Sequence, residues 1–139
     1  MNVARRLKNK LIQYIEPLKP ADDIIVIDGK NLDEATLPVI AIEISSESAH
    51  SYALWNVLNC RVSILYRVHA GDVDQSTLDD HLDVLEGLFE SPEIIISLSD
   101  ESDLTIFNWL YQGSVQEWND SSIDTIFTAE CVVTRKPVN

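Results

Sequence analysis

The chain has 139 residues, of which 45% are apolar and 24% charged, and this length and composition predict one folded domain and exclude a disordered chain. Its 23 Asp and Glu against 10 Lys and Arg give a net charge of −13, which argues against duplex DNA binding, because such surfaces neutralise phosphates with Lys and Arg. No apolar run approaches the roughly 20 residues that span a bilayer, and the N-terminus lacks the features of a secretory signal.

The charge is unevenly distributed along the chain. Residues 1–20 contain five basic side chains and only Glu16 as an acid, a balance of +4, so residues 21–139 carry −17. Between Arg67 and Arg135 there are fifteen Asp and Glu and no Lys or Arg. We therefore expect a single domain, 1–139, with a basic N-terminal helix in 1–20 and an acidic α+β body over 21–139.

The first expected element is an amphipathic helix over residues 2–16. Apolar side chains recur at steps of three and four residues, and Arg and Lys occupy the other face. Pro17 and Pro20 end the helix. The apolar set is Val3, Leu7, Leu11, Tyr14, Ile15 and Leu18.

Three strands are expected next. Residues 24–28 form a short β-branched run closed by the turn signal Asp28-Gly29, and residues 39–45 alternate like a half-buried strand. The polar segment 45–51 predicts a hairpin connection or a loop. After it, residues 60–69 show the clearest alternation of apolar and polar side chains in the sequence.

A central helix is predicted over residues 76–90. Its leucines recur at helical spacing and its outer face is acidic. Ser76 and Asp79 resemble a capping box, and acids near a helix N-terminus are favoured by the helix dipole.

Two closing strands are predicted over 104–111 and 123–134, whereas 91–103 is ambiguous between a short strand and a loop. This order of elements predicts an α+β fold. We expect a mostly antiparallel sheet of about five strands, with the N-terminal helix and the central helix packed on one face.

A calcium loop is one interpretation of the acids before the central helix. Thr77 stands where the sharp turn of such a loop needs Gly, and a strand precedes it where a helix would be required. The acids are better explained as residues of the helix start. The positions in the calcium register are Asp72, Asp74, Ser76, Leu78, Asp80 and Asp83.

No arrangement of catalytic residues stands out. His50 with Ser48 and Ser51 could form a triad, but no Gly-flanked nucleophile turn accompanies them. His69 and His81 could bind a metal with a nearby Asp, although a solvated pair at the two ends of a turn is the simpler interpretation. Only four glycines occur, in four separate places, so no phosphate-binding loop is present. We expect no enzyme activity, no cofactor and no metal.

The aromatic residues favour packing or assembly. Phe107, Trp109 and Tyr111 are expected on one face of their strand, where stacking of nucleic acid bases would need a positive groove that this half of the chain lacks. Core packing or a subunit contact is the better interpretation. Trp55 and Trp118 lie at expected strand ends, where a large aromatic side chain serves as a packing plug or an interface anchor.

Two cysteines, Cys60 and Cys131, lie within predicted strands. They lack the C-x-x-C spacing of zinc or dithiol sites. We interpret both as buried free thiols.

The order of these elements resembles a family of bacteriophage proteins. In VIAIEISSESAHSYALWNVLNCRVSILYRVHAGDVDQSTLDDHLDVLEGLF, a strand, a polar hairpin, a long alternating strand and an acidic helix follow one another. The closing strands within 104–134 and the basic helix 1–16 continue the likeness, whereas 91–121 has no clear counterpart. The pattern is similar to the small tail terminator, or tail completion, proteins of tailed bacteriophages.

That resemblance implies a structural virion protein, located in the tail and assembled in the host cytoplasm. Its copies would form a ring, usually hexameric, that caps the tail tube and joins it to the neck. The partners would be other copies of the chain, the tail tube protein and the neck or connector proteins. The resemblance implies no catalytic residues.

The charge distribution is compatible with such a ring. A ring needs a heterologous interface, in which one surface of each copy meets a different surface of the next. DNA would pass through an acidic lumen without binding, because like charges repel. We expect the basic helix either to pair with acids of a neighbouring copy or to touch another tail component. The candidate interface residues are Arg5, Arg6, Lys8, Lys10, Asp79, Asp80 and Asp83.

Two other functions remain open. The long stretch without basic residues also suits an acidic protein that mimics DNA and inhibits a host nuclease or restriction system, although many of its acids are expected in turns and helix starts. A small enzyme or ligand-binding domain with a pocket under the hairpin is the third possibility, but no residue stands out as its nucleophile or base.

Overall fold

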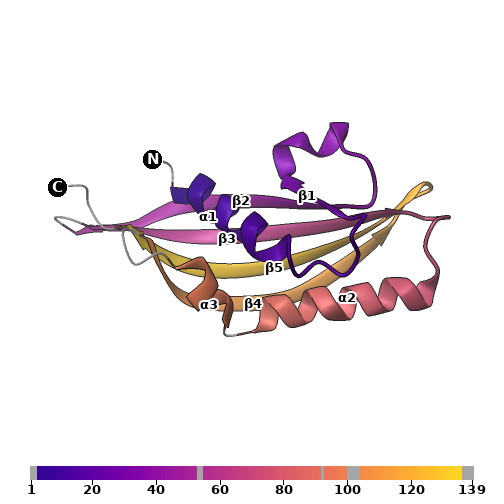
Figure 1. Ribbon diagram of the computed structural model, residues 1–139. Helices are drawn as coiled ribbons and strands as arrows, with labels where there is room; N and C mark the ends of the chain where they lie inside the picture. Colours follow the sequence, from indigo (N-terminus) through magenta and orange to yellow (C-terminus); the bar gives the residue numbers. More distant parts are fainter. Residues whose placement is uncertain (1–2, 53–54, 92, 100–103, 136–139) are drawn as a thin grey trace.

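The fold is built on one curved sheet of five strands (Figure 1). The computed structural model describes residues 3–52, 55–91, 93–99 and 104–135. The strands lie in the order β1-β2-β3-β5-β4, and every pairing is antiparallel except that of β1 with β2. The predicted α+β class is therefore confirmed. The strands are β1 (Ile25–Asp28), β2 (Val39–Tyr52), β3 (Trp55–His69), β4 (Leu104–Trp118) and β5 (Ser122–Arg135).

Three α-helices cover one face of the sheet (Figure 1). These are α1 (Val3–Ile15), α2 (Gln75–Glu90) and α3 (Glu93–Leu98). Each contributes apolar side chains to a single core that also holds the inward residues of β2, β3, β4 and β5. Because the basic helix shares this core, it is part of the same folded unit as the acidic body. No helix in the described ranges is both long and apolar enough to cross a membrane.

Helix α1 confirms the predicted amphipathic pattern. Its residues at positions 3, 7, 11 and 15 are buried against the sheet. Tyr14 is half-buried and donates a hydrogen bond from its hydroxyl to the carbonyl of Leu88, at 3.2 Å, which links α1 to α2. Leu18 lies beyond the end of the helix and is exposed, so it does not belong to the apolar face as predicted.

The hairpin of β2 and β3 is longer than the sequence predicts. Residues 45–51 were expected to form a connection, but they continue β2, in register with β3 from Ser45 opposite Arg61 onward. A bulge between Ser48 and His50 interrupts the ladder without ending it. The polar composition of this segment is compatible with a strand, because pairing with β3 satisfies the backbone donors and acceptors.

A short 3-10 helix, η1 (Gly29–Glu34), covers the opposite face of the sheet at one end. It connects β1 to the parallel strand β2, and the Asp28 side chain caps its start by accepting a hydrogen bond from the amide of Lys30. Gly29 lies so close to the Glu43 side chain that a Cβ atom at this position would collide with it. Val39 and Ala41 alternate along β2 with the core residues Ile40 and Ile42 and are also buried, so this part of the strand is buried on both faces and not on one face as predicted.

Helix α2 starts one residue earlier than predicted and has a different N-cap. The carboxylate of Asp74 accepts a hydrogen bond from the amide of Thr77 at 2.7 Å, so Asp74, and not Ser76, caps the helix. Tyr66 on β3 and His81 on α2 lie 2.8 Å apart, hydroxyl oxygen to Nδ1, and this contact ties the helix to the sheet.

Helix α3 occupies part of the segment that the sequence left ambiguous between strand and loop. Ile94 and Leu98, four residues apart, are both fully buried, so these two side chains lie on one helical face against the core. Tertiary packing has outweighed the β propensity of these residues. The hydroxyl of Ser99, just after α3, accepts a hydrogen bond from the amide of Ile106 at the start of β4.

Candidate subunit interface

Strand β4 forms one edge of the sheet, and its two irregularities decide where its side chains point. The register against β5 shifts between Phe107 and Leu110 and again between Tyr111 and Gly113. Asn108 has a positive φ of 55°, a conformation that Asn tolerates better than most residues, and Gly113 has a φ of 98°. Both are features of β-bulges, which place an extra residue in one strand and bend it.

The first bulge overturns the prediction that Phe107, Trp109 and Tyr111 share one face. Phe107 pairs with Val132 on the open face of the sheet, whereas Tyr111 pairs with buried Ala129 on the helix side. The Trp109 indole donates a hydrogen bond to the carbonyl of Phe89 on α2, at 2.8 Å. Two of the three aromatic residues are therefore packed against the core, and one is exposed on the open face.

Strand β4 carries more exposed large hydrophobic side chains than any other element of the described chain. Four of the seven exposed large hydrophobic side chains lie on it: Phe107 (46% exposed), Leu110 (59%), Val115 (64%) and Trp118 (61%). The first three pair with Val132, Glu130 and Ile126 on β5, whose side chains point away from the helices, so all three lie on the open face of the sheet. We call Phe107, Leu110 and Val115 the β4 patch. Long apolar edge strands are templates for pairing with another chain.

A second edge is open on the far side of the sheet. β1 pairs with β2 only from Val39 to Ile42, so β2 from Glu43 to Tyr52 has no strand partner on that side among the described residues. The sheet thus offers one long edge at β4 and another along the outer half of β2.

The open face between these edges is hollowed. A concavity of about 770 Å³ crosses β2, β3, β5 and β4, and its lining includes Ser45, Leu110 and Val132. Across it, Arg61 on β3 and Glu130 on β5 form an exposed ion pair at 3.0 Å.

The structure places the seven predicted interface residues on two separate helices. Arg5, Arg6, Lys8 and Lys10 lie on α1, and Asp79, Asp80 and Asp83 lie, exposed, on α2. Within one chain the two groups are not brought together as a single site. Their role in contacts between copies stays a prediction.

Some of these side chains already have partners within the chain. Lys8 Nζ lies 3.0 Å from Asp28 Oδ1, and Asp79 accepts a hydrogen bond from Gln75. The Lys8 ammonium and the Lys30 amide help hold the pKa of Asp28 below its usual value against the opposing effect of burial. Arg5 is exposed, whereas Arg6 and Lys10 are half-buried.

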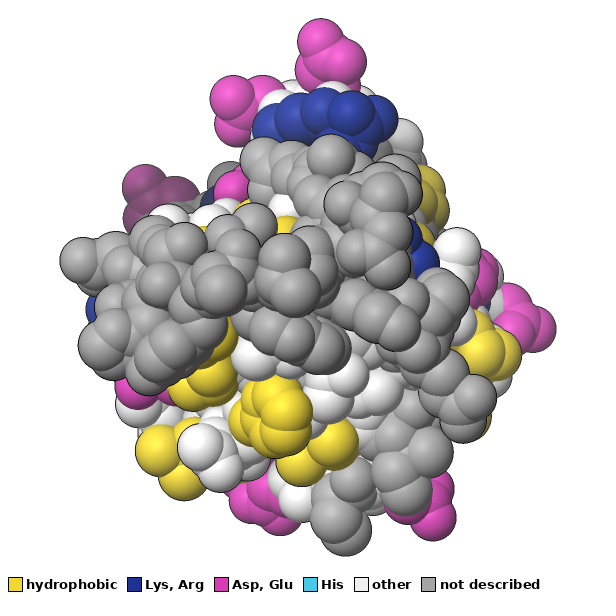
Figure 2. All heavy atoms as spheres, turned by 90° about the vertical axis from the view of Figure 1, so that its left-hand side faces the viewer, with side chains coloured by type: hydrophobic (Ala, Val, Ile, Leu, Met, Phe, Trp, Pro, Cys, Tyr) yellow, Lys and Arg dark blue, Asp and Glu magenta, His cyan; other side chains and the backbone are white. Residues whose placement is uncertain are grey.

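In the view onto the end of the sheet where β2 ends, Lys and Arg side chains gather at the top with acids directly beside them, and hydrophobic side chains lie toward the bottom and along the right-hand side (Figure 2).

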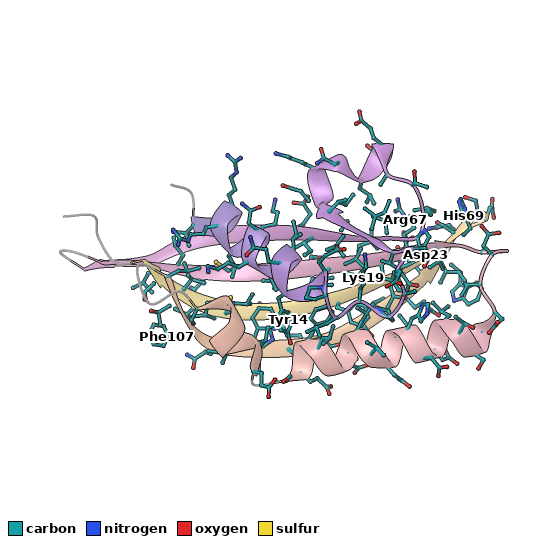
Figure 3. The ribbon with its side chains drawn as sticks, in the orientation of Figure 1. Tyr14, Lys19, Asp23, Arg67, His69 and Phe107 are labelled. Carbon is teal, nitrogen blue, oxygen red and sulfur yellow. The ribbon has the colours of Figure 1, made fainter. Side chains whose placement is uncertain are left out.

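A partly buried ion pair lies at the other end of the open face. The Arg67 guanidinium donates to both carboxylate oxygens of Asp124, at 2.8 and 2.9 Å, and Asp124 is only 5% exposed. These hydrogen bonds raise the pKa of Arg67. Arg67 and His69 line a pocket beneath the segment that follows η1, far from Phe107 (Figure 3). Because Asp124 already engages the guanidinium, we interpret the pair as structural.

The other candidate sites from the sequence find little support in the geometry. The calcium register fails because its residues from 75 onward are helical, with Asp74 engaged as the N-cap. His81 contacts Tyr66, and the described residues contain no cluster of His, Cys, Asp and Glu that could hold a metal. Ser48, His50 and Ser51 lie outside the described side chains, as does Trp55.

Comparison with known proteins adds no assignment. The chain matches no model of a protein family, and no curated protein matches it.

The sequence prediction missed Val115 of the β4 patch because it ended this strand at residue 111. Trp118, interpreted as a plug or an anchor, lies exposed at the end of β4 and donates to Gln116.

Proposed function

We propose that this chain is a structural protein that assembles with copies of itself, head to tail, into a closed ring. The observation that supports this proposal is the β4 patch, an apolar surface on an edge strand of 15 residues. An edge of this kind favours pairing with another chain. In this proposal the chain is not an enzyme.

The two open edges suggest how copies meet. β4 of one copy would lie against the outer half of β2 in the next, and because these surfaces differ, the contact is heterologous and can close into a ring. Side chains on the open face of the neighbour's β2 would then lie beside the β4 patch. The basic residues of α1 and the acids of α2 would add charge complementarity at or beside this contact.

We further propose that the ring is the tail terminator of a tailed bacteriophage, usually six copies, as the resemblance of the sequence pattern implies. It would cap the tail tube and join it to the neck in the virion. A net charge of −13 per copy would keep the passing DNA from adhering to the lumen.

The test is the assembly state of the protein with and without tail tubes. Mass photometry and negative-stain images should show rings of wild-type protein, alone or on tube ends. Leu110→Asp should abolish them, because it places a charge in the β4 patch. Val84→Asp is the matched control, since Val84 is a comparably exposed apolar residue on α2 (43% exposed). A wild-type monomer under both conditions, or equal loss of rings in both variants, would contradict the proposal.

A second function is favoured by the surface of α2. Asp79, Asp80, Asp83 and Glu90 are exposed along its 16 residues, and an acidic stripe on a long surface helix can mimic the phosphates of DNA. In this alternative the chain binds and inhibits a host nuclease or restriction enzyme.

Salt separates the two functions. A complex of acids with a basic nuclease surface should weaken steeply as salt rises, because screening removes the attraction. Contacts between copies that are made mainly through the apolar β4 patch should persist as salt rises, because the burial of apolar surface does not depend on charge. Sedimentation of the protein, alone and with a nuclease, over a salt series would distinguish these responses.

A further inference from the structure

The two cysteines of the chain are directly opposite each other in the sheet. Cys60 on β3 pairs in register with Cys131 on β5, 71 positions further along the chain, and both side chains are buried on the helix side. Residues directly opposite on antiparallel strands have Cβ atoms about 4.5–5.5 Å apart, close to the separation that a disulfide requires. The sequence, which shows no C-x-x-C motif, gives no sign of this proximity.

The two thiols also interact with each other. Their interaction lowers the pKa of Cys60 despite its burial, and the interaction together with burial raises the pKa of Cys131 well above its usual value. The two thiols therefore do not behave as independent groups.

Cys60 and Cys131 border the concavity on the open face, but their side chains point to the other side of the sheet, where they are only 2% and 4% exposed. A small oxidant therefore reaches the sulfurs only through local opening of the core.

We propose that Cys60 and Cys131 form an oxidation site at which hydrogen peroxide converts the two thiols into a cross-strand disulfide. The Cys60 thiolate attacks one peroxide oxygen, the O–O bond breaks, and hydroxide leaves, so Cys60 becomes a sulfenic acid. The Cys131 sulfur then attacks the Cys60 sulfur, the S–O bond breaks, and water leaves with the proton of Cys131. Two thiols are oxidised by two electrons, and one peroxide is reduced.

The disulfide would link the two central strands of the sheet. Position 60 lies opposite Ser46 on β2 as well, next to the half of β2 that lacks a partner at its outer edge. The link would therefore brace the end of the sheet where β2 and β3 extend beyond β1. This site does not depend on the formation of a ring, so its test and that of the proposed function can fail separately.

A trivalent arsenical tests the proximity of the thiols in the reduced protein. Phenylarsine oxide bonds two thiols at once only when they lie close together. The wild-type chain should bind one equivalent, and Cys60→Ser and Cys131→Ser should each bind roughly a hundredfold more weakly, because the second bond is no longer intramolecular. Equal affinity of the wild type and both variants would show that the thiols act independently and would overturn the proposal.

Oxidation of the full-length protein tests the product. After hydrogen peroxide treatment, titration of the denatured protein should show the loss of two thiols per chain, and a peptide map should join the peptides of Cys60 and Cys131. Dithiothreitol should restore both thiols. The peptide map needs only the wild-type protein, so this test remains possible even if a serine variant fails to fold. Two intact thiols, overoxidised Cys60 beside a free Cys131, or disulfides only between chains would each refute it.

Discussion

Loss of the Arg67 guanidinium should be among the most destabilising single changes on the open face of the sheet. Arg67 and Asp124 form two charged hydrogen bonds at 2.8 and 2.9 Å, and Asp124 is 5% exposed. Arg67→Ala would leave a buried carboxylate without its partner. Breaking a fully buried pair in this way costs about 3–5 kcal/mol, and because the Arg67 side chain is 29% exposed, we expect a loss toward or below the lower end of this range.

The chain contains its own control for this prediction. Arg61 and Glu130 form a second cross-strand ion pair between the same strands, β3 and β5, at 3.0 Å, but their side chains are 65% and 43% exposed. Water and salt screen such a pair, so Arg61→Ala should cost no more than about 1 kcal/mol. The difference between the two variants isolates the effect of burial from that of pairing.

Urea unfolding followed by far-ultraviolet circular dichroism would measure both changes, provided that the slope against urea stays constant. The double variant Arg67→Met with Asp124→Leu should recover most of the lost stability, because no unpaired charge then remains. If Arg67→Ala costs no more than Arg61→Ala, Asp124 is hydrated in solution and the reasoning from its burial is wrong.

Three further changes test the core, the cap and the alkaline response. Phe127→Ala should cost about 3–5 kcal/mol in urea unfolding, because the ring is fully buried and meets Phe89 edge to face at 5.3 Å between centroids; a loss below about 1 kcal/mol would contradict this packing. Asp74→Ala should lower the urea midpoint and Ser76→Ala should not, since only Asp74 caps α2; the reverse result would restore the capping box. Burial, with a smaller effect from a nearby acid, raises the pKa of Tyr66 from 10.0 to about 12. Because the folded state holds this proton more tightly than the unfolded state, the free energy of unfolding should fall by about 3 kcal/mol between pH 10 and 12. Tyr66→Phe should reduce that fall in unfolding curves measured over a series of pH values.

The sequence predicts well those elements whose side chains follow a single period. Helix α1 and strand β3 have apolar residues at steps of 3.6 and 2, and their buried faces are those expected. The fold class follows from the order of such elements. Local pattern is sufficient here because the face that packs on the core is the one that the sequence marks as apolar.

Prediction fails where a distant partner decides the local structure. Residues 45–51 carry no apolar alternation, yet they extend β2 because β3 provides backbone partners for them. The isoleucines of α3 have strand propensity, but Ile94 and Leu98 are buried only as a helix. In both segments the long-range contact outweighs the weak local preference.

The candidate interface was hidden from the sequence for two reasons of the same kind. An apolar run such as that of β4 would be buried if β4 were an inner strand of the sheet. β4 is an edge strand only because of the strand order, which is set by pairing between segments far apart in the sequence. The bulge at Asn108 then separates Phe107 from Trp109, which strict alternation would place together. Without that extra residue, either Phe107 would turn toward the core or Trp109 would lose its hydrogen bond to α2. The bulge thus lets one strand pack its indole against a helix and still present an apolar patch on the open face.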